Sequence, residues 1–190
     1  MPWNLPTLLT WTRVLAIPLL VAVFFLPIGE FSRNLLATVL FVAAALTDWL
    51  DGWLARRWGQ TSAFGAFLDP VADKLIVCVA LVMLVDLQRV DAVVAAIIVG
   101  RELTISALRE WMAQMGARAS VAVHSIGKFK TMAQLVAIPL LLYDGMLGGL
   151  FHTHRLGTWL IWIAAVLTVW SMLYYLRQAW PVLRDGGSKV

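Results

Sequence analysis

Residues 48–73 of the chain, DWLDGWLARRWGQTSAFGAFLDPVAD, contain four of its 11 acidic residues. In an α-helix, where successive residues are rotated by about 100°, Asp48 and Asp51 lie within one arc about 100° wide. Asp69 and Asp73 lie one turn apart on the next predicted helix. Because a turn containing Gly and Ser separates the two helices, we expect them to be antiparallel neighbours whose four carboxylates converge.

Outside this segment the chain is strongly apolar. Hydrophobic residues make up 61% of its 190 residues and charged residues only 14%, whereas soluble globular proteins contain about 25% charged residues. This composition excludes a soluble enzyme, a disordered chain and a nucleic-acid-binding module. A membrane span needs about 20 residues, so the length allows about six membrane helices. We expect them at residues 6–26, 33–58, 69–87, 91–115, 120–143 and 155–181.

The predicted fold is therefore an all-α integral membrane protein. It is a six-transmembrane-helix bundle formed by one membrane-embedded domain, residues 1–190. A short N-terminal segment containing Trp3 and Trp11 would lie at the membrane interface, where tryptophan is enriched. The single cysteine, Cys78, lies in an apolar run and is interpreted as a packing residue.

The distribution of basic residues predicts how the six helices are oriented. Lys and Arg are concentrated on the side of the membrane that holds both termini, which indicates cytoplasmic termini. Ten lie on that side: Arg13, Arg56, Arg57, Arg109, Arg118, Lys128, Lys130, Arg177, Arg184 and Lys189. Three lie on the opposite side: Arg33, Arg89 and Arg155.

Four aspartates at membrane depth need compensating cations. Each costs about 2.5 to 3.5 kcal/mol on insertion scales, or about 10 to 14 kcal/mol for the set. The nearby cations, Arg56 and Lys74, are too few in number and too far from the centre of the four carboxylates to offset this cost. Oxygen ligands suit Mg²⁺ or Mn²⁺, and four carboxylates suit a pair of such ions. Two metals held close together clamp a diphosphate and assist in-line displacement at phosphorus.

Each aspartate also has a simpler interpretation when it is taken alone. Asp69 precedes Pro70 and is suited to be a helix N-cap with Pro at the first helical position. Asp48 could be a solvated residue at a helix end. The set of four, with the small residues Gly52 and Ala55 on the same face, favours the metal site over these alternatives.

The segment matches the pattern D-x2-D-G-x2-A-R-x8-G-x3-D-x3-D at all eight specified positions. It resembles the signature of the CDP-alcohol phosphotransferases. Three further stretches are similar to the phosphatidylglycerophosphate synthases within that family: NLPTLLTWTR (4–13), GRELTISALREW (100–111) and SIGKFKT (125–131). The resemblance implies a six-helix membrane bundle that forms a homodimer in the bacterial inner membrane, with its active site on the cytoplasmic side.

The resemblance also implies roles for individual residues. Two divalent ions, Mg²⁺ or Mn²⁺, would be held by Asp48, Asp51, Asp69 and Asp73, and Asp73 would also be the general base. The residues implied to bind CDP-diacylglycerol are Gly52 and Ala55 beside the cytidine, Arg56 at the diphosphate, and Ser62, Thr7 and Thr10 elsewhere on the nucleotide lipid. A diphosphate needs metals and a guanidinium, so the chemistry agrees with these assignments.

The second substrate is expected to be sn-glycerol 3-phosphate, whose phosphate needs basic ligands. The candidates lie around the fourth-to-fifth helix connection: Arg109, Arg118, Lys128 and Lys130. Arg101 lies two turns before Arg109 and could be deeper. An alternative interpretation is that these residues only obey the positive-inside rule and contact lipid headgroups. His152 and His154, in the opposite loop, are expected to be solvated rather than metal ligands.

The predicted reaction is transfer of a phosphatidyl group from CDP-diacylglycerol to sn-glycerol 3-phosphate, with release of CMP. Other acceptors remain open within the family: inositol phosphate, serine or phosphatidylglycerol. A divalent-cation transporter is the alternative from another class. Two features disfavour transport, since the sequence has no inverted repeat and the carboxylates lie at helix ends rather than at the midplane.

Overall fold

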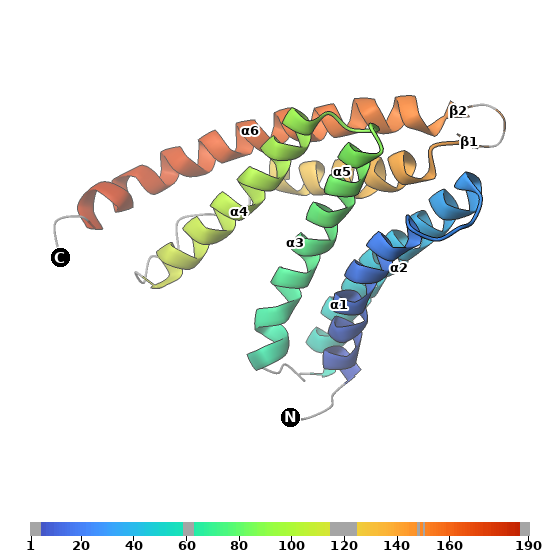
Figure 1. Ribbon diagram of the computed structural model, residues 1–190. Helices are drawn as coiled ribbons and strands as arrows, with labels where there is room; N and C mark the ends of the chain where they lie inside the picture. Colours follow the sequence, from blue (N-terminus) through green and yellow to red (C-terminus); the bar gives the residue numbers. More distant parts are fainter. Residues whose placement is uncertain (1–4, 59–62, 115–124, 148, 150, 187–190) are drawn as a thin grey trace. The chain divides into compact units, whose positions relative to one another are not determined.

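The computed structural model describes residues 5–58, 63–114, 125–147, 149 and 151–186. Six helices and one two-stranded hairpin occur within these residues (Figure 1). The helices are α1 (Leu5–Val23), α2 (Glu30–Trp58), α3 (Ala63–Asp86), α4 (Ala92–Gln114), α5 (Ser125–Tyr143) and α6 (Thr153–Gly186). The strands are β1 (Met146–Leu147) and β2 (Phe151–His152), which pair antiparallel.

The predicted all-helical class is confirmed, and most helix ends lie within a few residues of the expected ones. The main difference is that α3 begins at Ala63 rather than at residue 69. Asp69 therefore lies inside the helix, and its interpretation as an N-cap is wrong, because an N-cap residue has non-helical backbone angles. Pro70 is likewise inside α3, as membrane helices tolerate. The short hairpin was not predicted.

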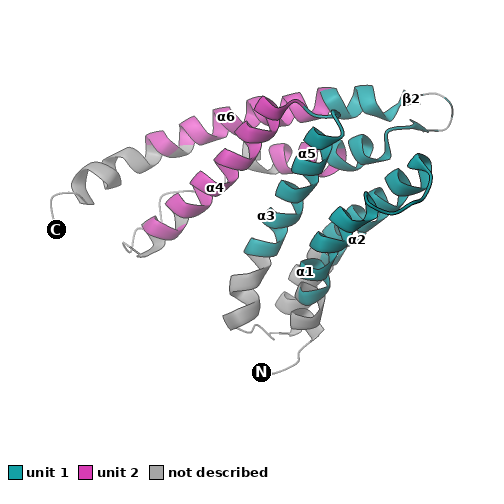
Figure 2. Cartoon of the chain, in the orientation of Figure 1, with its two compact units in different colours: residues 1–90, 137–158 teal, residues 91–136, 159–190 magenta. Residues whose placement is uncertain are grey.

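The chain consists of two compact units, each held together by contacts among its own residues (Figure 2). Unit 1 consists of residues 1–90 and 137–158, and unit 2 consists of residues 91–136 and 159–190. In unit 1, α1 packs against both α2 and α3, and α2 also contacts α3. The prediction of one domain over residues 1–190 stays a prediction.

The backbone conformation at the end of α3 determines where Arg89 lies. Gln88 adopts a left-handed backbone conformation with φ 58°. The Gln88 amide donates to the Val85 carbonyl at 2.9 Å, and the Arg89 amide donates to the Leu84 carbonyl at 2.8 Å. This pair of bonds is a Schellman motif, which ends a helix and satisfies its last carbonyls. It turns the chain so that Arg89 leaves the axis of α3.

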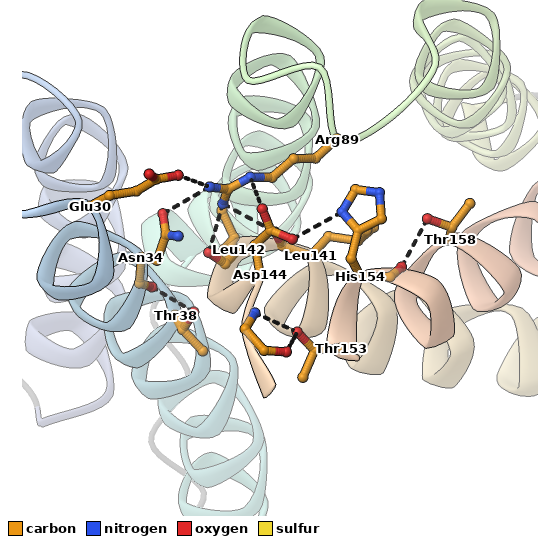
Figure 3. A network of polar contacts seen from close by, with 11 residues as sticks. Glu30, Asn34, Thr38, Arg89, Leu141, Leu142, Asp144, Thr153, His154 and Thr158 are labelled. Carbon is orange, nitrogen blue, oxygen red and sulfur yellow. Dashed lines mark hydrogen bonds and ion pairs between the residues drawn. The ribbon is translucent and has the colours of Figure 1, made fainter. Parts of the chain in front are cut away.

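The buried Arg89 side chain contacts the C-terminal end of α5 (Figure 3). Its guanidinium donates to the carbonyls of Leu141 and Leu142 at 3.3 and 2.9 Å. Its Nε lies 3.0 Å from a carboxylate oxygen of Asp144. A cation at a helix C-terminus is favourable because the last carbonyls carry partial negative charge. Arg89 therefore caps α5 while it is anchored at the end of α3.

The same network reaches α2 and α6 within unit 1. Arg89 donates to the side-chain oxygen of Asn34 at 3.1 Å, and it lies 3.5 Å from Glu30. The Nδ1 atom of His154 lies 3.0 Å from the other carboxylate oxygen of Asp144 (Figure 3). His154 was expected to be solvated, and its half-buried ring has this additional partner. One ion-pair network thus links four helix ends.

Two segments of the described residues are long and apolar enough to cross a membrane, Glu30–Thr47 and Thr153–Tyr174. Trp11–Val23 and Phe129–Tyr143 are apolar but shorter. The first half of α3 and the middle of α4 contain charged residues, which shorten their apolar runs. The six-span arrangement therefore stays a prediction, while the helical architecture and the apolar helices indicate a membrane protein.

The side chains of α6 show the polarity expected of a helix in lipid. Its outward side chains are large and apolar, with Trp159 72% and Trp170 65% exposed. Its buried positions include the small or polar residues Ala164, Thr168 and Ser171. Membrane helices pack through small residues and present large apolar residues to the hydrocarbon, so this pattern favours a lipid-facing surface.

Candidate active site

The four aspartates lie on two consecutive helices of unit 1 that are joined by only four residues, 59–62. Asp51 lies seven residues before the end of α2 (51 to 58), and Asp69 lies six residues after the start of α3 (63 to 69). Asp48 and Asp73 are each ten residues from the same helix ends (48 to 58 and 63 to 73). At 1.5 Å per residue, the two pairs lie at matched depths of about 10 and about 15 Å from the connection.

This register fits the predicted metal centre. Two divalent ions need carboxylates from both helices at similar depths, and oxygen donors are the ligands that Mg²⁺ and Mn²⁺ prefer. The side chains of Asp48, Asp51 and Asp69 lie outside the described residues, so their convergence and their metal ligation stay predictions. Asp73 is the one member of the motif tetrad whose side chain the structure describes.

Asp73 is ion-paired with Arg13 of α1. Nη1 of Arg13 lies 2.6 Å from Oδ1 of Asp73. The Arg13 side chain is only 1% exposed, whereas that of Asp73 is 41% exposed. The contact between α1 and α3 therefore brings a buried cation to the edge of the motif from a position 60 residues away in sequence. Charge-assisted bonds of this kind are short and about twice as strong as neutral ones.

Sequence reasoning did not predict that Arg13 contacts a candidate site residue. It was part of the N-terminal similarity and was counted among the basic residues of the cytoplasmic side, but only Arg56 and Lys74 were weighed as cations against the aspartates. A signal was present, because Arg13 lies inside the apolar run predicted for residues 6–26. A charge at such a position needs a partner, since an isolated buried cation is costly.

A second group of charged side chains lies in unit 2, between α4, α5 and α6. Lys130 is buried, and its amine lies 2.9 Å from Oε2 of Glu102. The same oxygen lies 3.1 Å from Nη1 of Arg101. Nη2 of Arg101 donates to the hydroxyl of Ser171 at 3.1 Å. Glu102 thus pairs with two buried cations, Arg101 of its own helix and Lys130 of α5, and Lys130 is a predicted phosphate ligand.

Two more buried polar groups occur on the helices of this cluster. Gln134 follows Lys130 by one helical turn, and Thr168 precedes Ser171 by nearly one turn. Neither the side-chain nitrogen of Gln134 nor the hydroxyl of Thr168 has a hydrogen-bond partner within the described part of the chain. These two side chains add to the buried polar groups on the helices of unit 2.

The structure places the other predicted residues only at the level of the backbone or not at all. Their side chains lie outside the described residues in α1 (Thr7, Thr10), α2 (Gly52, Ala55, Arg56), α4 (Arg109) and α5 (Lys128). Ser62 and Arg118 lie outside the described chain altogether. Their binding roles stay predictions.

Comparison with known proteins covers both units. The family described as CDP-alcohol phosphatidyltransferase matches residues 3–170. A protein of Salmonella choleraesuis (strain SC-B67), named CDP-diacylglycerol--glycerol-3-phosphate 3-phosphatidyltransferase, is 50% identical over 187 residues, which is 97% of this chain and all of the relative. Proteins with the same name from Escherichia coli (strain K12) and Shigella flexneri are 49% identical over the same extent.

The family match includes the whole aspartate motif, the buried Arg13 and the Lys130–Glu102 pair, and the similarity to these relatives extends over almost the entire length. Both exceed what a shared helical architecture alone would produce. The chain belongs to the CDP-alcohol phosphatidyltransferase family.

Proposed function

We propose that this protein transfers a phosphatidyl group from CDP-diacylglycerol to sn-glycerol 3-phosphate, giving phosphatidylglycerophosphate and CMP. The observation that carries the proposal is the identity of about one residue in two, over 97% of the chain, to relatives named for this reaction. The complete aspartate motif supports it, because each position needed for the chemistry is present.

In this reaction an acceptor hydroxyl oxygen attacks the phosphorus that carries the diacylglycerol. A new phosphorus–oxygen bond forms, the bond to the CMP phosphate breaks, and CMP leaves with the electron pair. Asp73 would accept the hydroxyl proton, because it is the last carboxylate of the motif and its side chain is 41% exposed. Arg56 would contact the diphosphate, while Gly52 and Ala55 leave room for the cytidine.

Two divalent ions, held by Asp48, Asp51, Asp69 and Asp73, would supply charge neutralisation at the diphosphate and polarisation of the reacting phosphorus. The matched depths of the aspartates on α2 and α3 support this ligand set. The family relationship supports a divalent metal in general, and both Mg²⁺ and Mn²⁺ prefer oxygen ligands of this kind.

The acceptor phosphate would be held by Arg109, Arg118, Lys128 and Lys130. Lys130 has three ammonium donors, and Glu102 accepts from its amine at 2.9 Å. We further propose that the protein is a homodimer in the inner membrane, with both termini and the active site in the cytoplasm.

The direct test is an assay of purified protein in detergent with labelled CDP-diacylglycerol and a panel of acceptors. We expect CMP release with sn-glycerol 3-phosphate and little with inositol phosphate, serine or phosphatidylglycerol. If CMP were released only with one of the other acceptors, the protein would belong to a different branch of the family. Because detergent solution has no ion gradient, turnover under these conditions also excludes cation transport as the primary activity.

A further inference from the structure

Two connections at one end of unit 1 expose large apolar side chains. Phe25, in the connection between α1 and α2, is 78% exposed, and Phe31 in the first turn of α2 is also exposed. In the hairpin between α5 and α6, Leu147 is exposed and Phe151 is 67% exposed. We call these four residues the apolar rim. A group of exposed apolar side chains marks a surface that meets lipid or another protein.

The two connections are fixed to the same end of unit 1. The ring of Phe31 packs edge-on against that of Tyr143 at the end of α5, with 6.1 Å between the ring centroids. The base of the hairpin is closed by two hydrogen bonds: the Thr153 amide donates to the Gly145 carbonyl at 3.0 Å, and the Gly145 amide donates to the Thr153 hydroxyl at 2.9 Å. The Arg89 network beside it links α2 to the end of α5 (Figure 3).

The register of the hairpin gives it two different faces. Leu147 pairs with Phe151, and Met146 pairs with His152. Side chains of paired residues lie on the same face of a sheet, and successive side chains lie on opposite faces. One face of the hairpin is therefore entirely apolar, whereas the other carries an imidazole beside a methionine.

The rim lies where the two apolar membrane-crossing candidates begin. Phe31 is inside the start of Glu30–Thr47, and the hairpin is followed at once by Thr153–Tyr174. Membrane helices pack on one another through small residues and present large apolar side chains to lipid. The large side chains of the rim therefore favour lipid over a second copy of the chain as the partner.

The backbone of the hairpin limits how deep it can lie. Within the described residues its sheet has only two strands, so each strand has an edge without a strand partner. Open sheet edges do not occur in lipid-exposed positions of the hydrocarbon core, because their amides and carbonyls need water or another polar partner. The hairpin therefore suits the boundary between headgroups and acyl chains, where its edges can be hydrated and its apolar face can contact lipid.

The length of α2 fits this placement. Asp51 lies 21 residues after Glu30 (30 to 51), which corresponds to about 32 Å along the helix. The hydrocarbon core of a bilayer is about 30 Å thick. A rim at one boundary would thus place the aspartates of α2 close to the other boundary.

We propose that the apolar rim is a lipid anchor, inserted at the membrane boundary opposite the aspartates. The face formed by Leu147 and Phe151 contacts the acyl chains, and the face that carries His152 points toward the headgroups and water. The anchor holds the aspartates at the depth of the lipid headgroups on the other side. This last consequence rests on the proposed function, because the headgroup concerned is that of CDP-diacylglycerol, whereas the insertion itself does not.

The test measures the depth of two neighbouring hairpin residues. Phe151→Cys and His152→Cys, each in the full chain with Cys78→Ala, are spin-labelled and reconstituted into vesicles of phosphatidylethanolamine and phosphatidylglycerol. Collision rates with oxygen, which concentrates in lipid, and with a water-soluble nickel chelate give the depth of each label. We expect the label at residue 151 about 5 to 10 Å below the phosphate level, as for other interfacial apolar faces, and the label at residue 152 at or above that level.

Two results would overturn the anchor. Frequent collisions of the residue 151 label with the nickel chelate would show that this face lies in water. Few collisions with either reagent would show that protein covers it, such as a second copy of the chain. If Phe151→Cys does not fold, Leu147→Cys reports on the same face.

The measurement requires no catalytic activity, so it is independent of the reaction. Absence of CMP release from CDP-diacylglycerol and sn-glycerol 3-phosphate by the unmodified protein would reject the proposed function and leave the lipid anchor to the collision data. Normal CMP release together with a residue 151 label in water would reject the anchor alone.

Discussion

Three of the buried cations pair with a carboxylate of a different segment. Arg13 pairs with Asp73, Arg89 with Asp144, and Lys130 with Glu102. In a chain with only 14% charged residues, such pairs indicate where polar chemistry is kept inside an apolar structure. The Arg89 pair lies at helix ends and has a structural role, whereas each of the other two contains a residue with a predicted role in the site, Asp73 or Lys130.

Metal dependence is the first prediction at the level of residues. Activity should disappear in EDTA and return with Mg²⁺ or Mn²⁺, because the motif carboxylates would otherwise face one another without sufficient countercharge. Asp48→Asn, Asp51→Asn and Asp69→Asn should each raise the metal concentration needed for half-maximal rate or abolish turnover. Metal titrations of CMP release measure this effect, and full activity in chelator would exclude the two-metal site.

Asp73 and the basic residues should affect different kinetic constants. Asp73→Asn removes the base, so kcat should fall by at least about 10²- to 10⁴-fold. Arg109→Ala and Lys128→Ala should mainly raise the KM for sn-glycerol 3-phosphate, because the acceptor phosphate does not react. Initial rates with each substrate varied in turn measure both effects. An increase in the KM for CDP-diacylglycerol instead would reassign the basic residues to the nucleotide lipid.

At the level of elements, α6 approaches α5 closely at Gly157 in unit 1. A Cβ atom at this position would lie 2.7 Å from Cγ of Leu141 and 3.3 Å from the carbonyl oxygen of Ala137. Leu141 is fully buried, and close-packed interiors resist such displacement. Gly157→Ala should therefore destabilise the protein by about 1 to 3 kcal/mol through overpacking.

Gly100→Ala is the matched control, since nothing lies within 4 Å of a Cβ atom at that helical position. It should leave stability unchanged or raise it slightly, because alanine is a better helix former than glycine. Thermal unfolding of the two variants in the same detergent measures the difference. Equal unfolding temperatures would show that α5 and α6 are not packed as closely as described.

Orientation is the prediction that belongs to the whole molecule. A cysteine introduced within residues 59–62, in a Cys78→Ala background, should react with an impermeant reagent only from the cytoplasmic face. His152→Cys, at an exposed position of β2 in the connection before α6, should react only from the opposite face. Labelling in intact cells and in inverted vesicles measures both. The physical basis is the predicted ratio of ten to three basic residues between the two sides, which follows from the expected six-span topology.

Much of this protein follows from local sequence. Long apolar runs separated by Gly and polar residues predicted six helices near their observed ends, because helix formation depends on neighbouring residues. The family also followed from the sequence, since the eight motif positions lie within 26 residues and need no folding to be recognised. The start of α3 was missed because Pro70 after Asp69 is a strong local signal for a helix N-terminus, and the packed membrane-type helix overrides it.

The pairing of buried charges depended instead on how distant segments pack. Arg13 and Asp73 are 60 residues apart, and Arg89 meets carbonyls more than 50 residues away. The sequence indicates that each buried cation needs a partner, but several carboxylates are available to each. The choice among them is made by helix packing, because an ion pair in an apolar interior forms only where two rigid helices bring the charges within bonding distance.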